Sequence, residues 1–403
     1  MNAISTDSAQ LNLVVSANFT AEPVESSLSY WLDNLRLPFS IEHAPFDQVF
    51  QQLLDPSSML RSNREGIGLL LVRLQNWMDQ ESASAPDHDS SLDKIAQDFI
   101  AAVREAQDHS TSQLIVCFCP ATGLDAAGSE QVARAERELT NSLREQGGVS
   151  VVSSASMLET YPLEEIADEH GERIASMPYT APFFSVLGTV LARRIYRQTF
   201  PAHKVLVLDC DDTLWGGLCG ELGPQGVALD EEHLALQRFA VEQRQDGKLI
   251  CLASRNNEAD VFAVFEQNPA MVLTRDDITA TQINWGLKSD SLAELAAKLG
   301  LGLDSFVFLD DDPVQCAEVQ RRFPTVLALQ VPRHGVDGFC RHIWQLDPRA
   351  STGEGSRRTA SYREHVARED VRTSSQSFQQ FLDSLELQVE IAALTESELA
   401  RAT

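Results

Sequence analysis

The chain has 403 residues, of which 43% are apolar and 23% charged, proportions typical of globular protein with two or three domains. Its 32 Lys and Arg against 59 Asp and Glu give a formal net charge of −27, which argues against nucleic acid or an anionic membrane as a partner. Because no apolar run is long enough for a membrane helix and no signal-peptide pattern opens the chain, we expect a cytoplasmic protein.

The first 200 residues alternate between apolar runs and amphipathic segments. The expected strands are Leu11–Val15, Gly68–Val72, Leu114–Phe118 and Val149–Val152. The expected helices are Glu25–Leu35, Leu92–Ala106, Glu130–Glu145 and one within Pro178–Phe200. The Ser-, Ala- and Asp-rich stretch Gln80–Ser91 is typical of a surface loop. This order predicts an α/β domain with a parallel sheet over residues 1–200.

A second alternation over residues 201–335 predicts a doubly wound parallel sheet. Its expected strands are Val205–Leu208, Leu249–Leu252, Met271–Leu273, Ser305–Leu309 and Val326–Leu329. Its expected helices are Glu232–Arg244, Glu258–Phe265, Ser289–Leu299 and Val314–Phe323. Only a short segment separates Asp209 from the helix at Glu232, which leaves room for no more than a minimal cap.

Residues 336–403 are expected to form a largely helical C-terminal segment. After a linker-like stretch, Ala350–Arg358, we expect helices at Tyr362–Val371 and Phe378–Leu385. A short strand pattern, Leu387–Ile391, follows near the end without an evident partner, which favours a chain cut from a longer polypeptide.

Chemically useful side chains follow the expected strands of the second domain. They are Asp209, Asp211 and Thr213, then Ser254, then Lys288, and finally Asp310 in the run Asp310-Asp311-Asp312-Pro313. Since the carboxyl ends of parallel strands share one edge of a sheet, these groups are expected to meet there. Two carboxylates can serve as nucleophile and proton donor, Ser254 and Lys288 can hold a phosphoryl group, and Asp209 with Asp310 offers oxygen ligands suited to Mg²⁺.

This ordered set resembles the haloacid-dehalogenase (HAD) superfamily of phosphotransferases. Its finer details resemble the FkbH-like glyceryl-transferase/phosphatase enzymes of polyketide assembly, here as a loading domain. The finer resemblance rests on Asp209-Cys210-Asp211-Asp212-Thr213-Leu214-Trp215-Gly216-Gly217, Cys219-Gly220-Glu221, Ser254-Arg255-Asn256-Asn257-Glu258, Ile283-Asn284-Trp285 with Lys288-Ser289, Phe308–Pro313, Tyr179-Thr180 and Tyr362-Arg363.

The resemblance implies a Mg²⁺-dependent reaction of 1,3-bisphosphoglycerate. The phosphoglyceryl group moves to an enzyme cysteine, loses its phosphate, and passes as glyceryl to the phosphopantetheine thiol of an acyl carrier protein. Asp209 matches the nucleophile and Asp211 the general acid/base. The phosphate-binding residues would be Thr213, Ser254, Arg255, Asn256 and Lys288. The metal ligands would be Asp209, Asp310 and the backbone carbonyl of Asp211.

The acyl acceptor has two candidates. Cys210, between the two carboxylates, is preferred, and Cys219 in the following Gly-rich loop is the alternative. Two other readings of the whole protein stay open: a plain HAD phosphatase of a small phosphate ester, and a non-catalytic domain that docks a carrier protein.

The first domain resembles, more loosely, the SGNH-hydrolase fold found at the start of FkbH-like proteins. Ser16 follows the first strand, where that fold keeps its nucleophile, but the flanking Gly-Asp is absent. Asp168 and His170 are two residues apart instead of the expected Asp-x-x-His. We therefore expect no esterase there, and favour a role in carrier docking or in shaping the acyl site.

Overall fold

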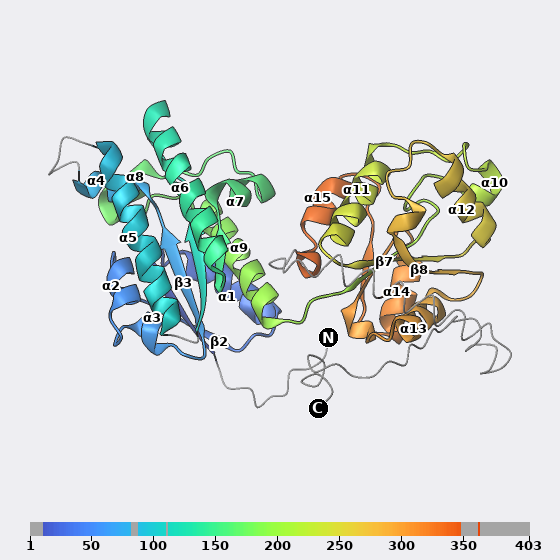
Figure 1. Cartoon of the computed structure of the whole chain (residues 1–403), viewed down its shortest axis with the longest axis horizontal. Helices are drawn as coiled ribbons and strands as arrows, with labels where there is room; N and C mark the ends of the chain where they lie inside the picture. Colours follow the sequence, from blue (N-terminus) through green and yellow to red (C-terminus); the bar gives the residue numbers. More distant parts are fainter. Residues whose placement is uncertain (1–10, 82–87, 110–111, 348–361, 363–403) are drawn as a thin grey trace, which may run out of the picture. The chain divides into compact units, whose positions relative to one another are not determined.

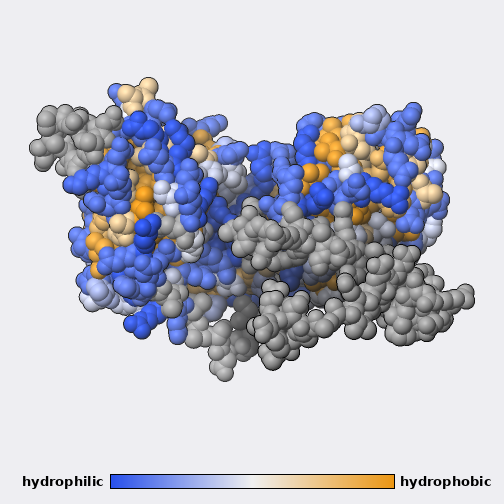
Figure 2. Space-filling view, viewed as in Figure 1, coloured by the Kyte–Doolittle hydropathy of each residue, from blue (hydrophilic) through white to orange (hydrophobic). Residues whose placement is uncertain are grey.

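The computed structural model describes residues 11–81, 88–109, 112–347 and 362, and the chain divides into two compact units between Pro201 and Ala202. Each unit is built around a five-stranded sheet whose paired strands are all parallel (Figure 1). The predicted pair of α/β domains with parallel sheets is thus confirmed. Among the residues coloured in Figure 2, hydrophilic side chains predominate on the face shown. None of the described helices combines the length and apolar character needed to cross a membrane.

The N-terminal sheet has the strand order β2-β1-β3-β4-β5. Its strands are β1 (Leu11–Ala17), β2 (Phe39–His43), β3 (Ile67–Val72), β4 (Gln113–Phe118) and β5 (Val149–Val152). Its helices are α1 (Val24–Asn34), α2 (Val49–Leu54), α3 (Met59–Ser62), α4 (Gln75–Glu81), α5 (His88–Asp108), α6 (Ala126–Gln146), α7 (Ser154–Thr160), α8 (Glu169–Ala175) and α9 (Ala181–Thr199). The sequence pattern missed the edge strand β2, none of whose residues is fully buried.

Side chains of β3 and β4 build the N-terminal core together with α2, α5 and α6. Elsewhere in this unit α1 and α9 lie close together, and a Cβ atom at Gly188 would come within 2.7 Å of Ser27 Cβ. The loop expected at 80–91 is shorter than predicted, because α4 continues to Glu81 and α5 begins at His88.

The C-terminal sheet has the order β10-β9-β6-β7-β8, with the first strand of the unit at its centre. Its strands are β6 (Val205–Leu208), β7 (Leu249–Ser254), β8 (Ile278–Ile283), β9 (Phe306–Asp310) and β10 (Leu327–Gln330). Its helices are α10 (Cys219–Leu222), α11 (Glu231–Gln245), α12 (Glu258–Gln267), α13 (Lys288–Leu299), α14 (Pro313–Arg322) and α15 (Val336–Arg341), with 3₁₀ turns at Arg275–Asp277, Leu303–Ser305 and Trp344–Leu346.

Successive residues of β6 enter two different cores, as the alternation of side chains along a strand requires. Leu206 and Leu208 pack with α11, α12 and α15, whereas Val205 and Val207 pack with α13 and α14. Helices therefore cover both faces of this sheet.

The described residues beyond position 335 belong to this unit. Val336, Cys340 and Leu346 lie in the first of its two cores, and the side chain of Tyr362 packs against the second. The elements expected at 350–358, 363–371, 378–385 and 387–391 lie outside the described residues.

The strand predicted at Met271–Leu273 is wrong, because the sheet uses β8 at this edge instead. The backbone N–H groups of Val272 and Leu273 donate to the buried side-chain oxygen of Gln237, at 2.8 and 3.1 Å. The side-chain oxygen of Gln237 thus accepts the hydrogen bonds that backbone carbonyl groups of a neighbouring strand would otherwise accept.

Candidate active site

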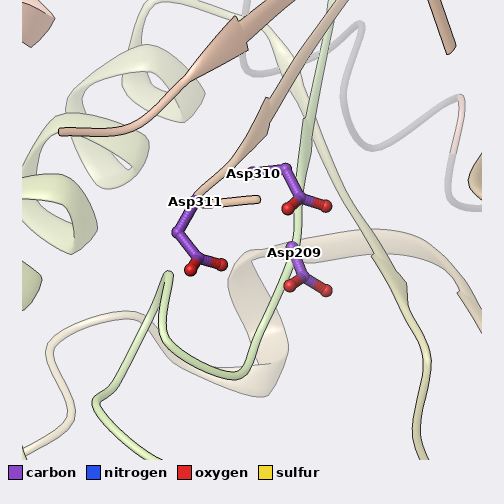
Figure 3. A group of neighbouring side chains, drawn as sticks. All are labelled: Asp209, Asp310 and Asp311. Carbon is purple, nitrogen blue, oxygen red and sulfur yellow. The ribbon is translucent and has the colours of Figure 1, made fainter. Parts of the chain in front are cut away.

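Three carboxylates meet at the carboxyl edge of the C-terminal sheet (Figure 3). Asp209 follows β6, Asp310 ends β9, and Asp311 comes next. Carboxylate oxygens of the three residues lie within 4.8 Å of one another. Two adjacent parallel strands thus hold like charges together, which disfavours the ionised forms unless a cation neutralises them.

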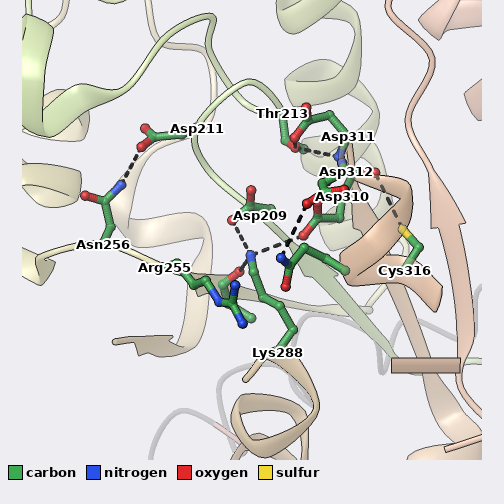
Figure 4. Close-up of polar contacts among 12 residues, drawn as sticks. Asp209, Asp211, Thr213, Arg255, Asn256, Lys288, Asp310, Asp311, Asp312 and Cys316 are labelled. Carbon is green, nitrogen blue, oxygen red and sulfur yellow. Dashed lines mark hydrogen bonds and ion pairs between the residues drawn. The ribbon is translucent and has the colours of Figure 1, made fainter. Parts of the chain in front are cut away.

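A buried lysine reaches these carboxylates from the first residue of α13 (Figure 4). Lys288 is 3% exposed, and its Nζ contacts Asp209 Oδ1 and lies 3.2 Å from Asp310 Oδ2. It also donates to the carbonyl of Ala253 at 2.6 Å. Burial acts to lower the pKa of Lys288, but Asp209 and Asp310 outweigh it and raise this pKa above its ordinary value. The ammonium group therefore stays charged and offsets part of the negative charge.

The carboxylates that remain suit a hard divalent cation. Burial, reinforced by Asp209, raises the pKa of Asp310 to about 6, and burial also raises the pKa of Asp311. Apart from its ion pair with Lys288, Asp310 Oδ2 has no hydrogen-bond partner among the described residues, although the side chain is 1% exposed. Such oxygen donors fit Mg²⁺. Asp311 was not among the expected ligands, although the run of three aspartates was a signal for it.

Three of the expected phosphate-binding residues lie around this edge in different roles. Thr213 donates to Asp311 Oδ1 at 3.2 Å and accepts from the Asp311 backbone N–H at 3.0 Å, so it fixes the acidic turn. Ser254 is the buried last residue of β7. Arg255 is exposed, and its Nε donates to the carbonyl of Gly286 at 3.0 Å.

The side chain of Asp211 lies outside the group of three carboxylates. It accepts hydrogen bonds from Trp215 Nε1 at 2.8 Å, from the Cys219 backbone N–H at 3.1 Å and from Asn256 Nδ2 at 2.7 Å. The next residue, Asp212, has a left-handed φ of 57°, and its carboxylate accepts from the backbone N–H of Gly217 at 2.7 Å. Trp215 is fully buried in the core, and it also holds the side chain of the expected acid/base.

Asn256, which we expect to bind phosphate, lies beside a cysteine. Its Nδ2 lies 3.4 Å from Cys219 Sγ as well as against Asp211. Burial, followed by Asp211, raises the pKa of Cys219 to about 12. Cys210 is fully buried in the core under the loop, and burial, then Asp209, raises its pKa well above the ordinary value. Of the two candidate acceptors, the structure brings Cys219 beside the Asp211 carboxylate.

The N-terminal unit does not assemble an esterase triad from the described residues. The Ser16 hydroxyl is fully buried and has no described hydrogen-bond partner. Asp168 accepts from the backbone N–H of Gly171 at 2.9 Å and caps α8, while His170 is exposed and lies 3.3 Å from Arg173. Asp168 and His170 thus make local contacts in and around α8.

No protein-family model matches the sequence, and no curated protein matches it either. Among solved structures, the N-terminal part of the protein BF1531 from Bacteroides fragilis, described as containing a phosphatase domain complexed with Mg, superposes with a TM-score of 0.72 at 21% identity. That match covers 85% of this chain and 94% of the other. The salicylyl-acyltransferase SsfX3 from a tetracycline biosynthetic pathway matches over 48% of this chain and 56% of its own, at 12% identity, but its TM-score of 0.31 carries no argument. The chain thus shares the fold of the Bacteroides protein.

Proposed function

We propose that the C-terminal unit is a Mg²⁺-dependent phosphatase of the HAD type that also transfers glyceryl to a carrier protein in polyketide biosynthesis. The phosphatase part rests on one observation: Lys288 is ion-paired with both Asp209 and Asp310 where β6, β7 and β9 end. The fold shared with a protein whose phosphatase domain was crystallised with Mg supports it.

Asp209, Asp310 and Asp311, with the backbone carbonyl of Asp211, would hold the ion, and Mg²⁺ supplies charge neutralisation at the phosphoryl oxygens when bound. The Asp209 carboxylate attacks phosphorus, the bond to the ester oxygen breaks, and Asp211 protonates that oxygen. Water then attacks phosphorus, the bond from phosphorus to the Asp209 oxygen breaks and releases phosphate, and Asp211 takes up the proton of the water. Lys288 keeps the Asp209 carboxylate in place throughout.

The transferase part adds a thioester step on Cys219. With 1,3-bisphosphoglycerate, Cys219 Sγ attacks the acyl carbon, the bond from that carbon to the phosphate oxygen breaks, and the thiol proton passes to the adjacent Asp211 carboxylate. Asp209 next removes the remaining phosphate ester as described above. The phosphopantetheine thiol of an acyl carrier protein finally takes the glyceryl group, and its proton returns to Cys219.

A second candidate is a plain phosphatase of a small phosphate ester. It is favoured by the burial of Cys219, which is 2% exposed and whose raised pKa of about 12 leaves almost no thiolate at neutral pH. The transferase therefore depends on Asp211 as a base at the moment of attack, whereas the phosphatase depends on no thiol.

Intact-mass measurement after incubation with 1,3-bisphosphoglycerate and Mg²⁺ separates the two. We expect a covalent phosphoglyceryl or glyceryl adduct on the wild-type chain and on Cys210→Ala, and none on Cys219→Ser. Asp209→Asn should retain the phosphoglyceryl form, because its nucleophile is gone. Cys340→Ala, a buried thiol on α15, is the matched control and should behave as wild type.

Two outcomes would redirect the proposal. An adduct that survives in Cys219→Ser but is lost in Cys210→Ala would move the acceptor to Cys210. Hydrolysis of phosphate esters without any adduct, unaffected by either cysteine substitution, would leave the plain phosphatase.

A further inference from the structure

A neighbouring helix holds the end of α13 that carries the buried lysine. Lys288 is the first residue of α13, and Leu287 before it provides no side-chain cap for the first backbone N–H groups. The carboxylate of Glu318, on α14, supplies a cap from outside the helix. Its Oε2 accepts from the backbone N–H of Ser289 at 3.1 Å, and its Oε1 accepts from the Ser289 hydroxyl. A negative charge here also suits the positive end of the helix.

A second residue of α14 reinforces this contact. Arg322 lies about one helical turn after Glu318. Its Nη1 donates to the Ser289 hydroxyl at 2.9 Å and also to Asp290 Oδ1. Because Ser289 is fully buried, the partners of its hydroxyl are protein groups, and both of those that the structure describes belong to α14. Two side chains of α14 thus hold the first turn of α13.

The same helix begins at the acidic turn of the site. Asp312 is the N-cap of α14, and its side chain accepts from the backbone N–H of Val314 at 2.8 Å. Asp310 stands two residues before this cap and lies 3.2 Å from the ammonium group of Lys288. Both members of this ion pair are therefore attached to α14, Asp310 through the chain and Lys288 through the grip of Glu318 on α13.

The place of the Lys288 backbone matters because a lysine reaches its partners through a long side chain with many rotamers. Its Nζ contacts Asp209 Oδ1 and donates to the carbonyl of Ala253 at 2.6 Å inside a buried site. Groups that act on a reacting atom must be held within about 0.5 Å of their working position. Fraying of the first turn of α13 would therefore move the ammonium group away from the carboxylate that attacks phosphorus.

We propose that Glu318 is a positioning residue of the active site, which acts through the first turn of α13 to hold Lys288 against Asp209. This inference rests on the proposed phosphatase function and deepens it. Because the ion pairs of Lys288 are made by Asp209 and Asp310, Glu318 influences the reaction through the backbone that it holds.

Steady-state hydrolysis of p-nitrophenyl phosphate by the full chain with Mg²⁺ tests the inference. Glu318→Ala removes both acceptors, and we expect kcat to fall about tenfold with KM nearly unchanged, as the loss of charge-assisted hydrogen bonds behind a group that acts in the transition state predicts. Glu318→Gln keeps an oxygen for the Ser289 backbone N–H and an amide group that can donate to the hydroxyl. Its kcat should stay within about threefold of the wild-type value.

Amine labelling measures the position of Lys288 without any reaction of a phosphate ester. Acetic anhydride at a low dose, followed by peptide mass spectrometry, compares Lys288, which is 3% exposed, with the exposed Lys204 of the same unit. We expect Lys288 to be labelled far more slowly than Lys204 in the wild type and in Glu318→Gln. In Glu318→Ala the labelling of Lys288 relative to Lys204 should rise several-fold.

Gly300→Ala is the matched control, because it disturbs the opposite end of the same helix. Gly300 ends α13 with a left-handed φ of 63°, a conformation that costs alanine stability. Urea unfolding should show that both Gly300→Ala and Glu318→Ala are destabilised, whereas kcat and Lys288 labelling should change in Glu318→Ala alone.

Three outcomes would count against the inference in different ways. An equal fall of kcat in Gly300→Ala, or unchanged kcat and labelling in Glu318→Ala, would overturn the positioning role and leave the phosphatase in place. A wild type that hydrolyses no phosphate ester would overturn the phosphatase itself, and the labelling comparison would then still confirm or refute the hold of Glu318 on Lys288.

Discussion

Both units of the chain place polar side chains at the carboxyl edge of a five-stranded parallel sheet, but they arrange charge there differently. In the N-terminal unit, Arg73 after β3 is 2% exposed and donates to Glu172, to Thr122 at 2.6 Å and to Asn76 at 2.9 Å. In the C-terminal unit, three carboxylates lie together, and one lysine is ion-paired with two of them. At the N-terminal edge, Arg73 is paired with groups of the same unit. At the C-terminal edge, the carboxylates outnumber the lysine, and the excess negative charge can be balanced by a bound cation. Charge that the fold leaves unbalanced is therefore a better guide to function than polarity at a sheet edge.

The sharpest test of this contrast is Asp209→Asn. We expect hydrolysis of a phosphate ester to fall by about 10³-fold or more, because the substitution removes the nucleophile. The free energy of unfolding without Mg²⁺ should stay level or rise, since one of three crowded negative charges is lost. Steady-state kinetics and urea unfolding measure the two effects. Asp168→Asn in the N-terminal unit is the control for activity, and full activity in Asp209→Asn would break the contrast.

Arg73→Met should produce the opposite pattern. Loss of the guanidinium leaves Glu172, Thr122 and Asn76 without a shared donor at a buried site, which should cost about 3 kcal/mol of stability. Denaturant unfolding measures this cost, while phosphatase activity of the folded fraction should remain unchanged. A stable variant with altered phosphate turnover would show that the N-terminal edge takes part in the chemistry.

Metal removal should distinguish the two units by their unfolding transitions. With Mg²⁺ at about 100 times its Kd, the C-terminal unit should gain about 2.7 kcal/mol and the N-terminal unit nothing. Calorimetric scans with Mg²⁺ and with a chelator compare them. The gain should disappear in Asp310→Asn, and a gain that persists there would place the ion elsewhere.

The smallest expected effect concerns a carboxyl group beside the carboxyl end of β5, in the N-terminal unit. Burial raises the pKa of Glu136, on α6, above its ordinary 4.5, against hydrogen bonds from Ser154 that act to lower it. The folded state therefore keeps a proton that the unfolded state has lost, so the contribution of Glu136 to stability falls as pH rises above 4.5. Glu136→Gln cannot titrate, and its unfolding free energy should decline less over that range. Identical pH profiles for the two chains would contradict the burial effect.

The sequence predicted which residues follow the buried strands at the carboxyl edge of the C-terminal sheet. The apolar runs that predict the strands also predict the position of the residues that come at or near their ends. These residues are Asp209, Ser254, Lys288 and Asp310. Strand β8 was not predicted because Thr279, Thr281 and Gln282 interrupt its apolar run, whereas the apolar stretch Met271–Leu273 bonds to a side chain.

Side-chain direction inside the loop that follows β6, from Asp209 to Gly217, could not be predicted. The left-handed φ of Asp212 turns the loop so that its carboxylate accepts from the Gly217 backbone N–H, and the Asn256 amide lies 3.4 Å from the Cys219 thiol. Such choices depend on single dihedral angles and on contacts between distant residues, to which hydrophobic periodicity is blind.

The exposed indole of Trp285, in the segment between β8 and α13, gives the protein an optical reporter of its own. Trp285 is 71% exposed and donates from Nε1 to Asn257 Oδ1 at 3.3 Å, whereas Trp77 and Trp215 are buried and Trp31 and Trp344 half-buried. Its fluorescence should respond to soluble quenchers far more than that of the other four. Ligand binding near Trp285 can then be followed in unlabelled protein, one residue away from Gly286, whose carbonyl accepts from Arg255.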